Sequence, residues 1–177
     1  MKLGRKFFER DTLSVAKDLL GKVICSKVGS GLIRGRIIET EAYVGEDDKA
    51  CHARFGRTKR NEVMYGKAGH TYIYLCYGIH YMLNIVTEKK NFPSAVLIRR
   101  IKPLGKKQGK NSYGPGSLTK FLRIDKRLNG EDITRSSEIW VEDDGYIVDK
   151  NNIFQGARIG IDYAGDYIKK PWRFWIE

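Results

Sequence analysis

Two glutamates on one predicted strand are the first residues whose types and spacing could do chemistry. The segment from Arg36 to Tyr43 is rich in β-branched and aromatic residues, which predicts a strand. Side chains alternate along a strand, so Glu39 and Glu41 share a face, and Ile37 and Tyr43 are expected beside them. Carboxylates are rarely buried without a partner or a task. This face either meets lysines at the surface or carries a catalytic acid, and the pattern does not choose between the two glutamates.

Tyrosines gather in a predicted hairpin, whose strands cover 71–77 and 81–87 on either side of Gly78. They are Tyr72, Tyr74, Tyr77 and Tyr81. Aromatic residues are common in ordinary strands, but they also offer flat faces on which nucleobases stack at roughly 1–3 kcal/mol per base. Tyr77 is expected near the tip, where a side chain that wedges into a duplex would sit.

Basic residues gather in two further segments, 54–60 and 99–110. The first contains Arg54, Arg57, Lys59 and Arg60, and the second contains Lys102, Lys106, Lys107 and Lys110. Such clusters are either solvated surface or contacts for a phosphate backbone. Arg99 differs from the others because it ends an apolar strand, where a buried guanidinium needs a carboxylate partner.

An acid on a core strand, an aromatic platform, a wedge and a basic rim together fit an enzyme that acts on a nucleobase. Such an enzyme must extrude the base from the stack, hold it, and attack its bond to the sugar. Cleavage of an N-glycosidic bond passes through an oxocarbenium-like sugar, and a carboxylate can activate the water and stabilise that charge. A positioned base contributes typically about 10²–10⁴-fold to such a rate.

Composition narrows the possible partners. The 177 residues include 33 lysines and arginines against 21 acidic residues, a net charge of +12. This surplus favours a polyanion, with nucleic acid ahead of an acidic membrane. We expect no membrane partner, because the sequence has no membrane-length apolar stretch, secretory signal or basic amphipathic helix. Three cysteines without a disulfide-scaffold spacing indicate reduced thiols in the cytoplasm. Cys76 and His80 lack the spacing of paired zinc ligands, so no metal site is expected.

The elements that must position these residues are mostly strands. A helix is predicted over 13–20, capped by Asp11 or Thr12 and ended by Gly21. The other predicted strands cover 23–25, 95–101, 139–141, 157–161 and 172–176. Pro103 is expected to end the strand over 95–101.

A long segment, 45–61, has no clean period and predicts a loop of the kind that carries function. The run 114–116, Gly-Pro-Gly, lacks the lysine and serine of a phosphate loop and predicts the start of a helix that runs through Leu122. No repeat, linker or βαβ alternation is visible. The sequence therefore predicts one α+β domain, 1–177, with a curved, mostly antiparallel sheet and a few flanking helices.

Several of these segments resemble one known family. They are 36–43 with His52, the hairpin 71–84, the strand 96–103, the run 114–116, and the tail from 157–161 through 170–174. In this order they resemble the alkyladenine DNA glycosylase family, the 3-methyladenine DNA glycosylase type found in mammals and many bacteria. The resemblance covers nearly the whole chain. It implies a single-domain curved sheet with a projecting hairpin that inserts into DNA.

The resemblance also implies catalytic roles. Glu41, rather than Glu39, matches the general base that activates the attacking water. Arg99 and a main-chain group of Ile159 match the groups that hold this water. The expected enzyme is monofunctional, without strand cleavage by a lysine, and uses no metal or cofactor.

The remaining site residues hold the base and the DNA. Tyr43, His52 and Tyr74 match the residues that sandwich the flipped base, Asn84 matches the residue that crowds the exocyclic amine of guanine, Leu97 lines the pocket, and Tyr77 matches the side chain that fills the vacated space. Arg57, Arg60 and Lys67 are expected at the DNA backbone.

The family's substrates are 3-methyladenine, 7-methylguanine, hypoxanthine and ethenoadenine. We therefore expect a cytoplasmic, nucleoid-associated monomer that repairs double-stranded DNA containing damaged purines. Two other functions stay open. One is a non-catalytic module that binds damaged DNA, and the other is an RNA-directed base hydrolase, because a stacking pocket does not report the sugar.

Overall fold

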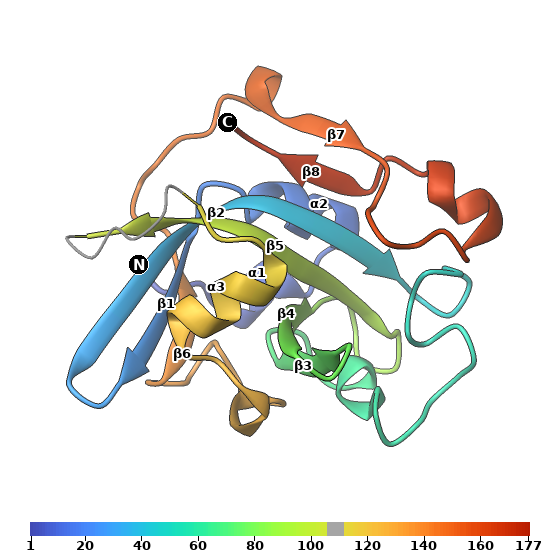
Figure 1. Cartoon of the computed structure of the whole chain (residues 1–177), viewed down its shortest axis with the longest axis horizontal. Helices are drawn as coiled ribbons and strands as arrows, with labels where there is room; N and C mark the ends of the chain where they lie inside the picture. Colours follow the sequence, from blue (N-terminus) through green and yellow to red (C-terminus); the bar gives the residue numbers. More distant parts are fainter. Residues whose placement is uncertain (106–111) are drawn as a thin grey trace.

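The molecule is built around one long strand, β2, which pairs along both of its edges. The computed structural model describes residues 1–105 and 112–177. Its strands are β1 (Val23–Val28), β2 (Gly31–Val44), β3 (Thr71–Cys76), β4 (His80–Val86), β5 (Ser94–Leu104), β6 (Ile139–Glu142), β7 (Phe154–Gly156) and β8 (Arg173–Trp175). β5 pairs with one edge of β2, while β1 and then β8 pair with the other edge. Figure 1 shows β2 and β5 crossing the centre of the molecule.

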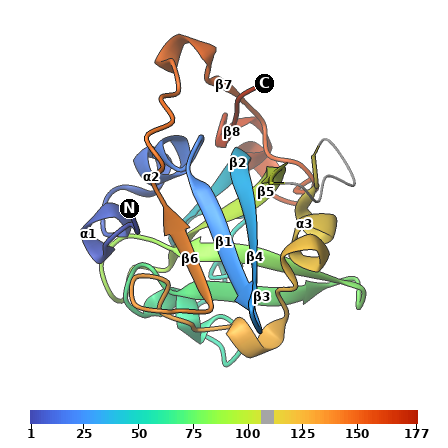
Figure 2. The same ribbon diagram turned by 90° about the vertical axis from the view of Figure 1, so that its left-hand side faces the viewer.

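Every strand pairing is antiparallel, in the order β3-β4-β5-β2-β1-β6, with β7 and β8 off this path. The sheet curls, so that the β3–β4 hairpin and the β1–β2 hairpin lie on different sides of the molecule, and the tip of the β3–β4 hairpin projects (Figure 2). The predicted α+β fold, with a curved antiparallel sheet and a projecting hairpin, is confirmed.

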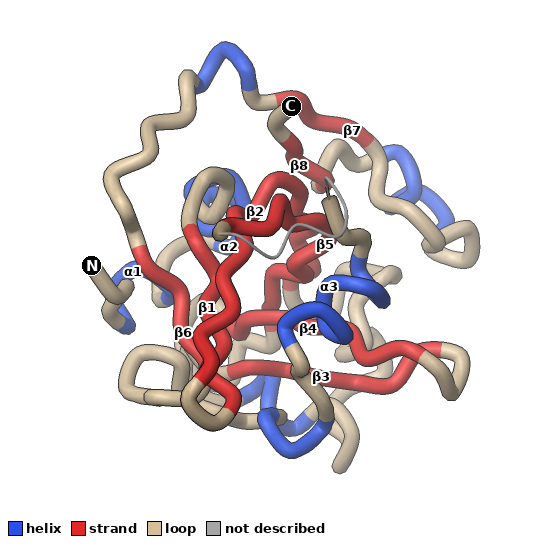
Figure 3. Tube along the Cα trace, turned by 60° about the vertical axis from the view of Figure 1, so that its left-hand side comes forward, coloured by secondary structure: helices blue, strands red, loops and turns tan. Residues whose placement is uncertain are grey.

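Few helices cover this sheet, as Figure 3 shows. They are α1 (Arg5–Phe8), α2 (Thr12–Asp18), α3 (Pro115–Leu122) and the 3₁₀ turns η1 (Glu62–Tyr65), η2 (Lys126–Leu128), η3 (Lys150–Asn152) and η4 (Gly165–Lys169). α2 begins as predicted, because the Asp11 side chain accepts the Ser14 N–H. α2 then packs on β2, where the Thr40 hydroxyl donates to the Ala16 carbonyl over 2.8 Å.

The main hydrophobic core lies between α2, α3 and the sheet. It collects side chains from most of the chain, from Phe8 near its start to Ile176 near its end. A second, smaller cluster lies under the 45–61 loop and includes Cys51, Met64 and Tyr72. Met64 and Tyr72 of this second cluster also line the cavity described below. Burial of apolar surface therefore helps to hold that wall of the cavity in place.

The predicted strand over 157–161 is wrong. The strand there is β7, which ends at Gly156, and the following residues form a loop. Gly160 takes a φ of +75°, outside the range of a strand. The Ile159 N–H donates to the Glu41 carboxylate instead of to a neighbouring strand. The segment therefore serves the site rather than the sheet.

Pro103 does not end β5, which runs on to Leu104. The Ile101 N–H points away from β2, to the Tyr113 carbonyl, and Pro103 has the same orientation two residues later. Its missing N–H is thus not needed for pairing with Gly35 of β2.

The three cysteines are free thiols. Cys25 and Cys51 are buried, and Cys76 is partly exposed where it lines the cavity. No helix in the described ranges is long and apolar enough to cross a membrane. Lys102 lies within β5 rather than in a loop. Lys106, Lys107 and Lys110 lie outside the described residues.

Candidate active site

A cavity of about 250 Å³ opens between β2, β5, the β3–β4 hairpin and the 157–163 loop. This volume lies just below the range of about 300–1,000 Å³ that is usual for ligand pockets. Nine residues to which the family resemblance assigns a role line it: Glu41, Tyr43, His52, Tyr74, Tyr77, Asn84, Leu97, Arg99 and Ile159. They come from four strands and three loops, so the fold brings together residues up to 118 positions apart in the chain.

Glu41 is completely buried in the wall of this cavity, and both of its oxygens are held. The Ile159 N–H donates to Oε1 over 2.9 Å, and the Tyr43 hydroxyl donates to Oε2 over 2.8 Å. Nε of Arg99 lies 3.5 Å from Oε1. Burial raises the pKa of Glu41 above its ordinary value of 4.5, although Arg99 and the two donors oppose this shift.

Glu39, the other candidate, is surrounded by guanidinium groups. Its carboxylate lies 3.1 Å from Arg99, 3.1 Å from Arg100 and 3.2 Å from Arg173. Glu39 does not appear among the residues that line the cavity. The structure therefore separates two residues that the alternation of side chains could not: Glu41 lines the cavity, whereas Glu39 pairs with three arginines, of which Arg99 also lines the cavity.

The prediction that Ile37 lies on the same face as the two glutamates is wrong. Ile37 belongs to the main hydrophobic core. The pairing of β2 with β5 shifts register between Ile37 and Glu39, and again between Glu39 and Thr40. Such a bulge interrupts the alternation of side chains. The residues before Glu39 and those after it therefore do not keep the same alternation, and Ile37 does not share the face of Glu41.

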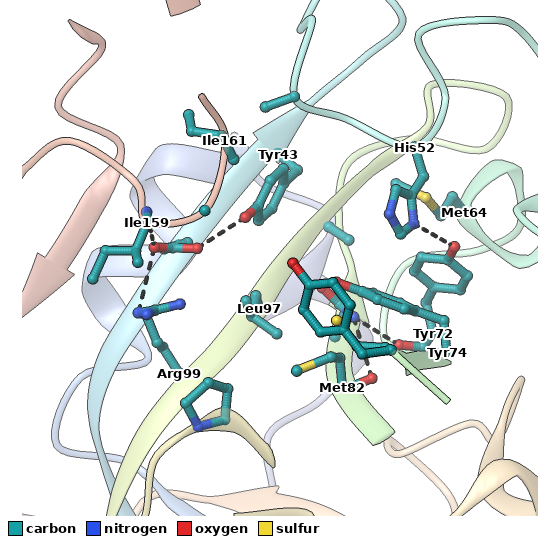
Figure 4. Close-up of a pocket in the computed structure, with 18 of the residues that line it drawn as sticks. Tyr43, His52, Met64, Tyr72, Tyr74, Met82, Leu97, Arg99, Ile159 and Ile161 are labelled. Atoms are coloured by element: carbon teal, nitrogen blue, oxygen red, sulfur yellow. Dashed lines mark hydrogen bonds and ion pairs between the residues drawn. The ribbon is translucent and has the colours of Figure 1, made fainter. Parts of the chain in front are cut away.

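Aromatic rings face each other across the cavity. Tyr43 lies on one side and His52 and Tyr74 on the other, with Leu97 between them (Figure 4). The His52 and Tyr74 ring centroids are 4.5 Å apart, and His52 Nδ1 lies 2.8 Å from the Tyr72 hydroxyl. Burial, with help from nearby Arg60 and Arg54, lowers the pKa of His52 to about 4. The imidazole is therefore neutral at neutral pH and presents an uncharged ring beside the cavity.

Two further residues line the cavity and are almost fully buried. Leu97 is 4% exposed and lines it with apolar surface. Asn84 is also 4% exposed, and its Nδ2 donates to the Tyr72 carbonyl over 3.0 Å. The Asn84 amide is thereby fixed in orientation, as a group that reads one edge of a ligand must be.

Tyr77 stands at the tip of the β3–β4 hairpin. The turn is closed by the Ile79 N–H, which donates to the Cys76 carbonyl over 3.1 Å. Its two central residues, Tyr77 and Gly78, both have positive φ, +51° and +68°. The Tyr77 side chain is 91% exposed. A bulky residue in the left-handed region is unfavourable, and the ring makes few contacts within the fold that would offset this cost.

Comparison with known proteins assigns the chain to a family. The sequence model of the family described as methylpurine-DNA glycosylase matches residues 6–177. The chain belongs to the methylpurine-DNA glycosylase family. It is therefore a DNA glycosylase, an enzyme that hydrolyses N-glycosyl bonds, and the resemblance drawn from the sequence is confirmed.

Three curated relatives of this chain are each named "Putative 3-methyladenine DNA glycosylase". The relative from Methanocella arvoryzae is 46% identical over 98% of this chain and 91% of its own length. The relative from Legionella pneumophila (strain Corby) is 44% identical over 99% of this chain and 94% of its own length. The relative from Clostridium perfringens (strain 13 / Type A) is 43% identical over 100% of this chain and 96% of its own length. The similarity thus extends over nearly the full length of both partners.

The basic residues expected at DNA lie outside the cavity of the glycosylase. Arg57 donates to the Asn91 side chain over 2.8 Å and stacks 4.4 Å from the Tyr65 ring. Arg60 lies 5.5 Å from the Tyr74 ring, beside the aromatic wall. Lys67 is exposed. Their role at the phosphate backbone stays a prediction.

Sequence reasoning missed one pair in this glycosylase, Asp48 and Arg158. Both side chains are fully buried and form an ion pair of 2.6 Å behind Tyr43. Asp48 stands in a run of charged residues, 46–49, and such runs usually lie in solvent. No feature of the sequence distinguishes it from its exposed neighbours, because its partner is 110 residues away.

Proposed function

We propose that the chain hydrolyses the N-glycosidic bond of flipped-out damaged purines in double-stranded DNA, with Glu41 as the general base. The proposed substrates are 3-methyladenine, 7-methylguanine, hypoxanthine and ethenoadenine. One observation carries the proposal: a buried carboxylate, held by two donors, faces the cavity between opposed aromatic rings. A module that only binds DNA gains nothing from a negative charge in such a place.

In the proposed reaction, Glu41 accepts a proton from a water molecule, whose oxygen attacks the anomeric carbon of the sugar. The bond from that carbon to the purine nitrogen breaks, and its electron pair leaves with the base. The carboxylate also stabilises the positive charge that develops on the sugar. Arg99, 3.5 Å from Oε1, and the Ile159 N–H limit the orientations open to the carboxylate.

The walls suit a flat and often cationic ligand. A purine slotted between Tyr43 and the His52–Tyr74 side would stack on both faces. Alkylated purines that carry a positive charge gain further from aromatic faces. A neutral His52 adds no repulsion to such a cation. Asn84 and Leu97, which line the cavity, are proposed to limit which purine edges fit.

The DNA itself is proposed to lie against the hairpin and the basic loops. Tyr77 enters the duplex where the base has left, and Arg57, Arg60 and Lys67 contact phosphates. We further propose that the chain works as a single-domain monomer on the chromosome, in the cytoplasm of its cell. A net charge of +12 favours this association at low ionic strength.

A panel of duplexes, each with one modified purine, tests the function. We expect release of free hypoxanthine or ethenoadenine, with the sugar-phosphate strand left intact and no covalent adduct trapped by borohydride. Tight binding to every lesion without release of any base would instead favour the non-catalytic binding module. Release from RNA in preference to DNA would favour the RNA-directed hydrolase.

The pH dependence follows from the state of Glu41. The base works only when ionised, and burial raises its pKa above 4.5, so the rate of base release should fall as the pH drops through that raised value. We expect an acid limb, measured under single turnover, centred above pH 4.5. Burial moves the pKa of His52 the other way, down to about 4, so a variant that lacks this imidazole should keep the acid limb. A rate that stays constant down to pH 4.5 would contradict the assignment.

A further inference from the structure

Arg158 and Asp48 form the most completely enclosed ion pair beside the cavity. Nη1 of Arg158 lies 2.6 Å from Oδ2 of Asp48, and Nη2 lies 2.8 Å from Oδ1. The Asp48 oxygens also accept the N–H groups of Val44 and Ala50, over 3.1 and 3.0 Å. The carboxylate is therefore fixed by four hydrogen bonds, and the guanidinium has one orientation imposed on it.

The guanidinium of Arg158 packs on two rings. Its central carbon is 4.7 Å from the centroid of Tyr43 and 5.0 Å from that of Trp172. Nη1 also donates to the Ala42 carbonyl over 2.8 Å. The group thus contacts the ring of Tyr43 and the main chain of the residue between Tyr43 and Glu41.

Arg158 reaches both groups that hold Glu41. The Tyr43 hydroxyl binds Oε2, and Arg158 packs on the Tyr43 ring. The Ile159 N–H binds Oε1, and Ile159 is the next residue in the chain after Arg158. Ile159 itself is 49% exposed, so its side chain provides little anchorage. The position of its N–H depends on the buried neighbour.

We propose that Arg158 and Asp48 are positioning residues for the reaction, which orient the Glu41 carboxylate through the Tyr43 ring and the Ile159 amide. The proposal rests on the proposed role of Glu41 as the base. The charge of Arg158 adds a smaller effect, since it lowers the pKa of Glu41 and so favours the ionised form.

An ion pair buried in this way is a poor device for stability alone. Removing two charges from water costs several kcal/mol per ion, and packed apolar side chains often stabilise as well or better. A planar guanidinium, however, can hold a carboxylate, a carbonyl and two ring faces in one fixed arrangement. This arrangement is what a site needs when a displacement of about 1 Å can cost on the order of 10²-fold in rate.

The test compares R158K and D48N with R36K. Lysine keeps the charge of Arg158 but cannot hold the bidentate geometry. Arg36 is a matched control, because it makes a bidentate pair with Asp144, at 3.1 and 2.8 Å, and stacks 4.1 Å from the Tyr146 ring. Neither residue of that pair lines the cavity. Single-turnover base release is measured across pH, together with affinity for lesion duplex and thermal unfolding.

We expect R158K and D48N to lower the rate of base release by up to about 10²-fold, the loss that follows a small misplacement of a catalytic group. Their acid limbs should move to higher pH, because Glu41 loses donors to its ionised form. Affinity for the lesion duplex should change far less, and R36K should behave as the parent. Combined with Y43F, the loss in R158K should be less than additive, since both act on one carboxylate.

Other results overturn the proposal. A lower unfolding temperature with an unchanged rate and pH profile would make the pair merely structural. Failure of both variants to fold, while R36K folds, would make it a folding element. A parent protein that releases no base from any duplex would instead remove the proposed function itself, which keeps the two failures distinct.

Discussion

Replacement of Glu41 by glutamine is expected to lower the rate of base release by about 10²–10⁴-fold, the typical contribution of a positioned general base. Glutamine has nearly the same shape, and its carbonyl oxygen can still accept the Ile159 N–H. It cannot take a proton from water at any accessible pH. Affinity for a lesion duplex should therefore survive, because the aromatic walls are untouched.

The measurement is single-turnover release of hypoxanthine or ethenoadenine, beside binding of the same duplex to E41Q. E142Q provides a control, since Glu142 is also a paired carboxylate on the sheet, 2.7 Å from Arg34, and does not line the cavity. E142Q should retain the parent rate. Full activity in E41Q would remove Glu41 from its role and return attention to Glu39.

Loss of the ring at Tyr77 is expected to weaken binding to a lesion duplex by roughly 5–150-fold, the equivalent of one base–aromatic contact of about 1–3 kcal/mol. The variants are Y77A and Y77G. The side chain is 91% exposed, so its removal opens no cavity in the fold. The effect should appear in affinity for DNA and in the fraction of base extruded.

The backbone conformation of Tyr77 adds an expectation for stability, which differs in direction from the expectation for DNA binding. Tyr77 has a φ of +51°, a conformation that costs a non-glycine residue about 1–2 kcal/mol. Glycine relieves that strain, so Y77G should unfold at a temperature no lower than the parent while it binds DNA more weakly. Y77F, which keeps the ring, should bind as the parent does. Equal affinity in Y77G and Y77F would show that the tip does not enter the duplex.

The elements with a strong local pattern could be predicted from the sequence. The strand over 36–43 and the hairpin around Gly78 are apolar and aromatic runs bounded by glycines, and both are present. The helix at Asp11 has a cap that the sequence displays. These signals are local, and so they survive without knowledge of the rest of the fold.

The errors have non-local causes. The residues 157–161 look like a strand, but their backbone is held by Glu41, far away in the chain. Pro103 remains in β5 because the position of its missing N–H points away from β2. That orientation depends on the register between β5 and β2. The burial of Asp48 depends on Arg158 in the same way. These features depend on contacts between residues far apart in the chain, which cannot be predicted from local sequence or composition.

The buried cysteines have a consequence for the durability of the protein. Burial raises the pKa of Cys25 and that of Cys51 to about 12 each, so at neutral pH almost none of either thiol is ionised. The thiolate is the form that reacts with electrophiles. Methylating agents that damage DNA should therefore react only slowly with these two buried sulfurs. Burial thereby keeps two of the three thiols from being consumed by such agents.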